Sequence, residues 1–465
     1  MQSIITQMLQ MVKANANPLA WEEALQYLFQ DWREELVLQA LGALDKALYW
    51  HYKQEGWRVD RLERRTVQFT FGKLTFQRRR LRKKGEKSFL PLDQAIGLEK
   101  RKRYSLAVRK GMAELGARLP FRQASQVVRL LTPLTISHTT LHTMTQEIGE
   151  HLQNYSEHRP EPDASTTKRK EVPVLFIEGD GLCLKSRDGE PLTLHRLLIH
   201  EGIDRRKKRT RLIHPFCFVS TQSSAEAFRQ LSHYLNHHYQ LKQTLVISNS
   251  DGGSGYEADK FEMAIGACRQ HEHCRDPYHV NRKIKDRLSF DRPMEYRLRK
   301  ALRAYDWTQI ESVLATAQSR VAACPSEIVA DRLDQIERLR GYLSRHWPYL
   351  QPIADRSLPV QKGTGVCETG HRYYSYRLKH QGRAWTHDGA RHVAAILNSV
   401  KNKEYARILT QKVDPTVQSL GEDIKGAVKA ALRTLQPATS QVQQGHIVNQ
   451  GPSSSPIGKL AKMFR

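Results

Sequence analysis

Two short apolar runs in the middle of the chain predict buried β-strands. The first runs from Val174 to Ile177 and ends in Glu178-Gly179-Asp180-Gly181. The second runs from Thr244 to Ser248 and ends in Asn249-Ser250-Asp251-Gly252. Both runs are short, rich in β-branched residues and stopped by glycine, which is typical of strands in a packed domain. Each predicted strand therefore ends in an aspartate that is followed by glycine.

The elements between these two runs predict the order of the sheet. Strand-like patterns cover residues 192–203 and 212–219, and a helical pattern covers residues 225–239. Three consecutive strands, a helix and a fourth strand describe an α/β core of the ribonuclease-H-like type. In that arrangement the first and fourth strands are neighbours. We therefore expect Asp180 and Asp251 to lie close together.

The region before the sheet predicts helices around a β-hairpin. Apolar residues recur at helical spacing from Trp21 to Tyr52, which indicates one or two amphipathic helices used for packing or self-association. Alternation from Thr66 to Phe76 around Gly72 predicts the hairpin.

A helix, a turn and a second helix are predicted after the hairpin. Phe121–Leu131 keeps its apolar residues on one face, and Thr132-Pro133 breaks the pattern because proline disfavours a helical conformation in the residue before it. Ser137 is a good N-cap for the second helix. A helix-turn-helix would present residues of this second helix to DNA, whereas a purely structural helix pair has the same pattern. The residues that would meet base edges or phosphates are Ser137, His138, Thr139 and His142.

The C-terminal half predicts a helical insertion. Helical patterns cover residues 256–270 and 280–288, and residues 296–349 are almost continuously helical. Glycines return from Gly363 to Gly370, and a further helix is predicted at 391–400. The chain after residue 436 is rich in Ser, Gln, Gly and Pro, which is typical of a flexible tail.

Composition adds a strong excess of positive charge. The chain has 74 Lys+Arg against 48 Asp+Glu, a formal net charge of +26, and residues 61–110 alone hold 17 Lys/Arg against 4 Asp/Glu. Such an excess favours polyanions, of which nucleic acid is the commonest. A charge run is also typical of a solvated face, but here a structured hairpin would present it to phosphates. The predicted DNA contacts are Arg78, Arg79, Arg80, Arg82, Lys83 and Lys84.

These patterns divide the chain into seven segments. They are an N-terminal helical region at 1–58, a basic DNA-binding region at 59–158, a linker at 159–171, the first part of the core at 172–290, the all-helical insertion at 291–355, the second part of the core at 356–435, and a flexible basic tail at 436–465.

Other features of the composition narrow the class of protein. No run approaches the roughly 18 apolar residues of a membrane span, and the N-terminus lacks a signal-peptide core, so we expect a cytoplasmic protein without membrane contact. The six cysteines are scattered, which argues against a disulfide framework and a zinc ribbon. The segment His271–Cys274 holds metal-ligand residue types, but its spacing matches no standard zinc motif.

The two aspartates at the strand ends suggest a cation site. Carboxylate oxygens are the ligands that hard cations such as Mg²⁺ and Mn²⁺ prefer. A single Asp-Gly pair often marks only a turn, and this alternative stays open. Two matched pairs after two buried strands favour a shared metal site for Asp180 and Asp251.

Several short elements follow one another in a defined order along the chain. They are Glu178-x-Asp180-Gly181, Asp251-Gly252, Asp276-x-x-His279, Glu368, Arg377-x-Lys379 and Trp385-Thr386-x-x-Gly389-Ala390. In this order they resemble the ISLre-type bacterial insertion-sequence transposases, relatives of the Mutator-like DDE group. The resemblance implies a ribonuclease-H-like catalytic domain interrupted by a helical insertion. It also implies two divalent metal ions, Mg²⁺ or Mn²⁺, and the movement of DNA ends by cut-and-paste or by copying.

The resemblance also implies roles for individual residues. It assigns catalysis and metal binding to Asp180, Asp251 and Glu368. It places Asp276 and His279 in an accessory element beside the active site, and Arg377 and Lys379 are candidates for phosphate contact. The sequence departs from the family pattern after the second acid, where Gly252-Gly253-Ser254-Gly255-Tyr256 replaces Gly-Ala and an aromatic–apolar pair.

Two other acids compete for the third position. Glu257 and Asp388 each stand at a predicted helix start, where the helix dipole alone favours an acid. Glu368 stands between glycines, ahead of basic residues, and has no such local explanation in the sequence. The sequence therefore favours Glu368.

The sequence favours a metal-dependent transposase that binds the ends of an insertion sequence and works as a homo-oligomer on DNA. One alternative is a domesticated DNA-binding protein that keeps the fold but no longer cuts. Another is a structure-selective nuclease with the same core, although the upstream DNA-binding region counts against it because such nucleases read shape rather than sequence. Short inverted repeats beside the encoding gene would favour the transposase.

Overall fold

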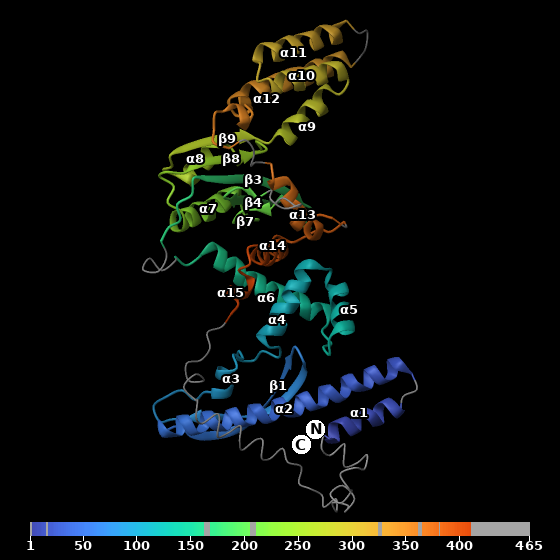
Figure 1. Cartoon of the computed structure of the whole chain (residues 1–465), viewed down its shortest axis with the longest axis vertical. Coiled ribbons are helices and arrows are strands. Elements are labelled where there is room, and N and C mark those ends of the chain that lie inside the picture. Colours follow the sequence, from blue (N-terminus) through green and yellow to red (C-terminus); the bar gives the residue numbers. More distant parts are fainter. Residues whose placement is uncertain are drawn as a thin grey trace, which may run out of the picture. The chain divides into compact units, whose positions relative to one another are not determined.

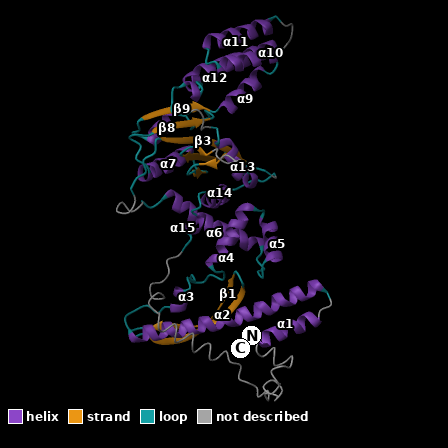
Figure 2. Cartoon of the chain, viewed as in Figure 1, coloured by secondary structure: helices purple, strands orange, loops and turns teal. Residues whose placement is uncertain are grey.

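The computed structural model describes residues 2–14, 17–161, 168–204, 211–323, 328–360, 365–380 and 382–410, with the backbone alone at 2–4, 18–19 and 367–369. The middle of the predicted linker and the predicted tail lie outside these residues. Contacts group the chain into two compact units. Unit 1 comprises the residues up to Val108 with Leu131–Leu134, and unit 2 comprises Arg109–Leu130 and Thr135–Thr410. The secondary structure of each is drawn in Figures 1 and 2.

Unit 1 is built from a long helix against a hairpin. Helices α1 (Gln2–Ala14) and α2 (Pro18–Gln54) are followed by strands β1 (Arg58–Phe69) and β2 (Gly72–Arg82) and by the short helix α3 (Pro91–Ala95). The hairpin prediction is confirmed, with the turn at Gly72, whose φ of +129° suits glycine. Alternate residues of the strands pack against α2 and α3, in a core of Leu48, Val67, Leu74, Phe76 and Leu92.

The charged side of the hairpin is less free than its sequence suggests. Arg78, Arg79 and Arg80 form ion pairs with Asp93, Asp45 and Glu63, respectively. Acids that lie 15 to 34 residues away in the sequence therefore neutralise this triplet, which contradicts its predicted role as a cluster of phosphate contacts. Arg82 and Lys84 remain exposed, and Lys83 lies 3.1 Å from Glu86.

Asp93 holds together the buried part of this charge network. Its carboxylate accepts a 2.6 Å hydrogen bond from Arg65 and also pairs with Arg78. The side chains of Arg65 and Arg78 are 8 % and 11 % exposed, so neither guanidinium is well hydrated. Burial accordingly lowers the pKa of Arg78 to about 10. These two ion pairs of Asp93 join the hairpin to α3.

We expect Asp93→Ala to lower the free energy of unfolding by about 3 kcal/mol, because it removes the carboxylate that two buried guanidinium groups share and leaves Arg78 with Glu63 at 3.5 Å. Urea unfolding of the full chain measures the loss. The matched control is Asp60→Ala, which removes the partner of Arg82, a side chain that is 69 % exposed. That exposed pair should contribute less than about 1 kcal/mol. Equal losses from the two variants would contradict the role given to Asp93.

Unit 2 contains a five-stranded mixed sheet. Its strands are β3 (Val174–Leu184), β4 (Leu192–His200), β7 (Phe216–Ser220), β8 (Leu245–Ser250) and β9 (Gln270–Arg275), in the order β7-β4-β3-β8-β9. Strand β4 pairs antiparallel with both β3 and β7, whereas β8 and β9 run parallel to β3. The predicted neighbourhood of the strands that carry Asp180 and precede Asp251 is therefore confirmed.

Several strand and helix bounds differ from the sequence prediction. Strand β3 does not end at Asp180 but continues to Leu184. The predicted helix over 256–270 is shorter, since α8 spans Ala258–Ile265 and residue 270 already begins β9. A separate two-stranded ribbon, β5 (Ile203–Asp204) and β6 (Arg211–Leu212), takes the ends of two predicted strands.

Helices cover both faces of the sheet (Figure 1). Helices α7 (Ser224–His238) and α8 pack on one face, where apolar side chains such as Leu231 and Phe261 meet the strands. Helices α13 (Cys367–Leu378) and α14 (His387–Lys401) contact β3 and β7, respectively. The side chain of Asn402, just after α14, exchanges hydrogen bonds with the backbone of Cys217, so the edge strand β7 is covered.

The predicted helix pair belongs to unit 2. Helices α4 (Leu106–Arg118), α5 (Phe121–Leu131) and α6 (His138–Glu157) precede the sheet, and Ser137 caps α6 as predicted by accepting the N–H of Thr140. Helix α6 packs on α14 so closely that a Cβ at Gly149 would lie 2.7 Å from Cα of His392. Contacts therefore join this pair to the sheet, whereas the sequence placed it in a region with the hairpin.

The predicted insertion is helical. Helices α9 (Pro277–Leu288), α10 (Arg292–Arg303), α11 (Trp307–Ala322) and α12 (Val329–His346) share one apolar core that includes Ile284, Leu298 and Leu339. Short 3₁₀ turns at Trp347–Tyr349 and Ile353–Asp355 lead back towards the sheet, and α15 (Tyr405–Ile408) ends the described chain. None of the helices that the structure describes combines the length and apolar character of a membrane span.

Candidate active site

Three aspartates follow one another across neighbouring parallel strands, with Asp180 within β3 and Asp251 and Asp276 directly after β8 and β9. In the sheet, Gly179 of β3 is paired with Ser250 of β8, and Ser250 is paired with Arg275 of β9. The next residue along each of these strands is Asp180, Asp251 or Asp276. Because paired residues of parallel strands lie at the same level, the three aspartates form one row at this edge. Ligand sites in open α/β sheets lie outside the carboxyl ends of the strands.

Asp180 is the most constrained of the three. Its side chain is 10 % exposed, and its two oxygens accept hydrogen bonds of 2.7 Å from the Gly181 N–H and from Nε2 of His371. Burial by itself raises the pKa of Asp180, but the hydrogen bond and charge of His371 outweigh it and the pKa is lowered. The carboxylate is therefore ionised at neutral pH, which a metal ligand must be.

Asp251 has a local role as well as a place in the row. It is half-buried, and its Oδ1 accepts a 2.8 Å hydrogen bond from the Gly253 N–H, the geometry of an Asx turn. Gly252 has a φ of +80°, and a Cβ there would lie 2.5 Å from Nη1 of Arg275. The glycine is thus required by the turn and by the buried arginine of β9, so the turn interpretation of this Asp-Gly pair also holds.

Asp276 is the N-cap of α9, and its Oδ1 accepts a 2.9 Å hydrogen bond from the Tyr278 N–H. Burial raises the pKa of Asp276, and the charges of Glu178 and Asp180 raise it further, while the Tyr278 N–H and His279 lower it. The charge of His279 also lowers the pKa of Asp180. The predicted accessory pair, Asp276 and His279, therefore lies within electrostatic reach of Asp180.

Glu178 links the central strand to α13. Its side chain is fully buried, and its Oε2 accepts hydrogen bonds of 3.1 and 2.9 Å from the N–H groups of Gly365 and Val366, just before the helix. One turn into α13, His371 reaches Asp180. The start of α13 is thereby fixed against the strand that carries the first acid.

The side chain of the predicted third acid, Glu368, lies outside the described residues, but its backbone is in the first turn of α13. The expectation that Glu368 stands apart from a helix start is therefore wrong, because the glycines before it precede a helix rather than a loop. Its position is three residues before His371, and positions i and i+3 share a helix face. The backbone thus places residue 368 on the turn of α13 nearest to Glu178.

Two residues that the sequence did not single out for this site are His371 and Arg196. Arg196 is fully buried in β4, opposite Asp180 in the antiparallel register, and its guanidinium lies 5.6 Å from the ring of Tyr374. Gly370 leaves room for this guanidinium beneath α13. Neither residue has a local sequence signal, because helix packing alone brings His371 to Asp180 and strand pairing alone places Arg196 opposite it.

The predicted phosphate contact of Arg377 is wrong. Its side chain is buried, donates to the backbone oxygen of Gly116 and lies between the rings of Phe121 and Trp385 at 5.4 and 4.7 Å. Burial, with the charge of Arg383, lowers its pKa to about 9. Arg377 therefore joins α13 to α4 and α5. The predicted DNA contacts Lys379, Ser137, His138 and Thr139 are exposed.

The segment His271–Cys274 is strand β9, in which His271 and His273 each lie 2.7 Å from Oγ of Ser248 on the neighbouring strand. Burial lowers the pKa of His273 to about 3 and raises that of the Cys274 thiol to about 11. These groups are neutral and take part in strand packing. No group of three metal ligands includes them among the described side chains.

The carboxylate groups of the row of aspartates suit a hard cation, but their ligand atoms are not yet close enough together to form a metal site. All three groups offer carboxylate oxygens, the ligands of Mg²⁺ and Mn²⁺. Among the described side chains, however, the three do not bring ligand atoms within 4.8 Å of one another, and His371 holds one oxygen of Asp180. A metal would have to displace His371 and draw Asp180, Asp251 and a third acid together.

Comparison with known proteins identifies relatives over most of the chain. A UPF0236 protein in the vanSb 3′ region of Streptococcus gallolyticus is 37 % identical over 461 residues, which is 99 % of each chain. In Caldanaerobacter subterraneus, a UPF0236 protein whose name joins eleven locus designations is 20 % identical over 355 residues, or 75 % of this chain and 70 % of that one. The model of UPF0236, described as an uncharacterised protein family, matches residues 19–409. The chain therefore belongs to the UPF0236 family.

Proposed function

We propose that this protein is a DDE-type transposase, which binds the ends of an insertion sequence and cleaves and transfers DNA strands with the help of divalent metal ions. The observation that carries the proposal is the row of Asp180, Asp251 and Asp276, in which Asp180 lies within β3 and the other two directly follow the parallel strands β8 and β9. The strand order β7-β4-β3-β8-β9 supports a ribonuclease-H-like core, since the first, fourth and fifth strands of that fold run parallel at one side of the sheet.

The names of relatives add independent support. One relative in Caldanaerobacter subterraneus carries eleven locus designations in one name, and another carries four. A protein that is encoded at many loci of one genome is what a self-propagating DNA element produces. The relative in Streptococcus gallolyticus is named by its place next to another gene, which is consistent with an inserted segment.

The residues of the chain divide the work as follows. Asp180, Asp251 and Glu368 would hold two Mg²⁺ ions, and Asp276 adds a carboxylate at the third strand end. When bound, such ions activate a water or a 3′-hydroxyl and stabilise the leaving oxygen of an in-line displacement. Glu178 fixes α13 beside β3, and His371 holds Asp180 ionised and oriented through Nε2–H. The basic surface supplies the remaining charge that phosphates require.

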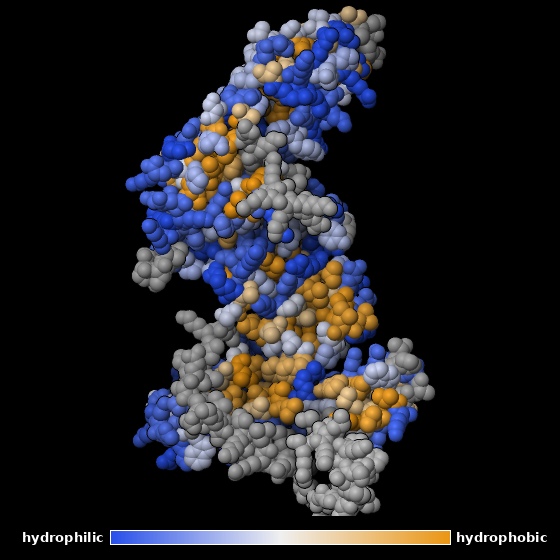
Figure 3. All heavy atoms as spheres, viewed as in Figure 1, coloured by the Kyte–Doolittle hydropathy of each residue, from blue (hydrophilic) through white to orange (hydrophobic). Residues whose placement is uncertain are grey.

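DNA contact is proposed for the exposed cations of the hairpin and for the start of α6. Arg82 at the end of β2 and Lys84 just after it are exposed, although Arg82 lies 3.7 Å from Asp60, and His138 and Thr139 open α6. Exposed apolar side chains on α1 and α2 (Figure 3) offer a surface for self-association on DNA. They include Ile5, Leu9, Tyr27, Phe29 and Leu36.

The proposal is tested with the full-length protein, Mg²⁺ and a plasmid that carries the two flanks of the encoding gene. We expect strand breaks at the borders of the element, absent from a plasmid with scrambled flanks, and an affinity for the flanks that falls steeply with salt as counterions are released. Binding without breaks would favour a domesticated DNA-binding protein. Breaks at branched DNA of any sequence would favour a structure-selective nuclease and contradict the proposal.

A further inference from the structure

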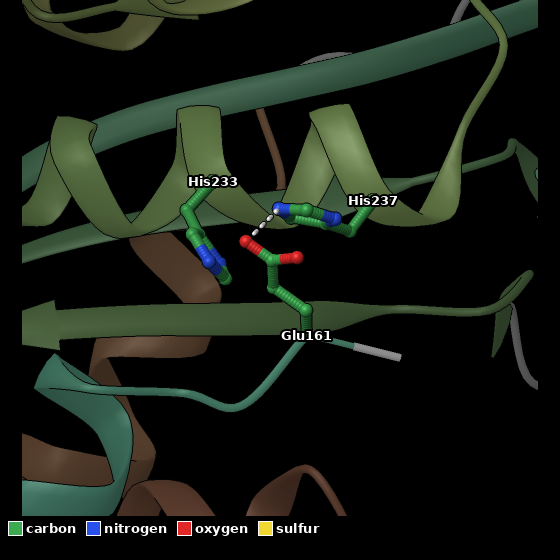
Figure 4. Close-up of side chains that lie close together, drawn as sticks. All are labelled: Glu161, His233 and His237. Atoms are coloured by element: carbon green, nitrogen blue, oxygen red, sulfur yellow. Dashed lines mark ion pairs between the residues drawn. The ribbon is translucent and has the colours of Figure 1, made fainter. Parts of the chain in front are cut away.

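Three potential metal ligands, none of which belongs to the row of aspartates, meet beside α7 (Figure 4). His233 and His237 project from the same side of this helix, four residues apart, with ring centroids separated by 4.5 Å. Glu161 approaches them from the segment after α6, and its Oε1 lies 3.7 Å from Nε2 of His237. One ligand atom from each residue lies within 4.8 Å of the others.

We propose that Glu161, His233 and His237 form a binding site for a divalent transition-metal ion, with Zn²⁺ as its natural probe. Two imidazoles and one carboxylate are a ligand set that Zn²⁺ takes, leaving a fourth tetrahedral position for water. Bond lengths of about 2.0–2.1 Å separate neighbouring ligand atoms on zinc by about 3.4 Å. The existing spacing therefore needs only small side-chain movements to close around an ion.

The chain just before Glu161 is anchored beside α7, so that the ligands are held near one another without a metal. Two residues before Glu161, Arg159 donates to both oxygens of Glu404 at 2.7 and 2.8 Å. Its guanidinium also lies 5.8 Å from the ring of Tyr234, the residue next to His233 on α7. The segment that carries Glu161 is thereby fixed beside the helix that carries the two histidines.

The local charge permits a cation at this position. Arg229, one turn before His233, is engaged by both oxygens of Glu226 at 2.7 Å, so its charge is largely compensated. The side chain of Glu161 is 74 % exposed, which leaves an entry path.

A bound ion would link two segments of the chain. It would join the segment after α6 to α7. The chain is already attached to the end of the same helix at Lys170, whose backbone N–H donates a 2.8 Å hydrogen bond to the backbone oxygen of His238. The connection between α6 and β3 would then be attached to α7 at two places. The site is independent of the proposed catalysis, because it shares no residue with the row of aspartates.

The test uses the tag-free full-length protein, stripped of metal and kept in saturating Mg²⁺ without DNA. We expect one equivalent of Zn²⁺ to bind in competition with a chromophoric chelator, to raise the melting temperature, and to be replaced by Co²⁺ with visible bands typical of tetrahedral nitrogen and oxygen ligands. His233→Ala and His237→Ala should each weaken Zn²⁺ binding by at least about 100-fold, since loss of a ligand exceeds the 10–100-fold cost of losing an outer partner.

Glu161→Gln keeps the proposal testable if a histidine variant folds poorly, because this exposed side chain can change without disturbing the core; it should weaken binding by at least about tenfold. The control is His151→Ala, which removes an exposed histidine of α6 outside the site and should leave binding unchanged. Zinc affinity that is equal in all four variants and the wild type would overturn the proposal. Absence of zinc binding by the wild type, or thiolate bands with Co²⁺, would overturn it as well.

Discussion

Asp180→Asn is expected to lower the rate of DNA strand cleavage by at least about 10³-fold, while the affinity for DNA stays within about twofold of the wild type. A metal ion that binds the attacking or the leaving oxygen stabilises the transition state by several kcal/mol, and its carboxylate ligands hold it in place. A loss of about 4 kcal/mol corresponds to about 10³ in rate. Asp180 is buried and is held by the Gly181 N–H and by His371. Its loss therefore removes negative charge from the site and leaves the basic surface as it was.

The comparison needs variants that separate charge from structure. Asp251→Asn should behave like Asp180→Asn, because the two residues directly follow the facing pair Gly179 and Ser250 on neighbouring strands. Asp188→Asn, an exposed aspartate after β3, is the matched control and should cleave at the wild-type rate. The measurements are nicking of end-bearing supercoiled plasmid in Mg²⁺ and a binding isotherm for the same ends. Unchanged cleavage by Asp180→Asn would refute the assignment of the first acid.

Glu368→Gln is expected to abolish cleavage to a similar extent, whereas Glu257→Gln and Asp388→Asn should keep most of it. The two competing acids have local partners. Glu257 is the N-cap residue of α8 and accepts the N–H of Gly255 at 3.0 and 3.1 Å. The side chain of Asp388 is 72 % exposed and pairs with Arg391 one turn along α14. Each therefore has a complete explanation in its own helix start.

Glu368 also stands at a helix start, where an acid is favoured, but its backbone position in α13 gives a second reason for an acid there. The start of α13 is bound by Glu178 of β3, and His371 of the same helix contacts Asp180. An acid in the first turn of α13 thus lies on the helix that already reaches the site. Cleavage assays on the three variants measure the effect, with melting temperatures as the check on folding. A Glu368→Gln protein that cleaves normally would transfer the third role to another acid, and Asp276→Asn would then be the variant to test.

The sequence by itself specified the elements whose pattern is local. Alternation around Gly72 predicted the hairpin, and helical spacing predicted α2, α5 and the helical insertion. The apolar runs ending near Asp180 and Asp251 predicted two buried parallel strands as neighbours, and the structure has them so. These features follow from the periods of helix and strand, which a sequence displays directly.

Strand β9 could not be found in this way. Its residues Gln270–Arg275 are polar and contain two histidines, so they give no apolar strand signal. They form a strand because β8 offers its free edge and because Ser248 accommodates both histidine rings. Only this pairing places Asp276 level with Asp251, which the sequence had no means to reveal.

Which charges are free was decided by the tertiary structure alone. Arg79 meets Asp45 and Arg78 meets Asp93 across the fold of unit 1, and Arg377 is buried beneath α4 and α5. A run of arginines looks the same in a sequence whether or not distant acids neutralise it. In the same way, helix packing alone brings His371 to Asp180, and strand pairing alone places Arg196 opposite it. Local pattern thus determined the strands and the first two acids, while contacts between distant residues determined the surroundings of those acids, because an ion pair or a packed side chain leaves no periodic trace in the chain.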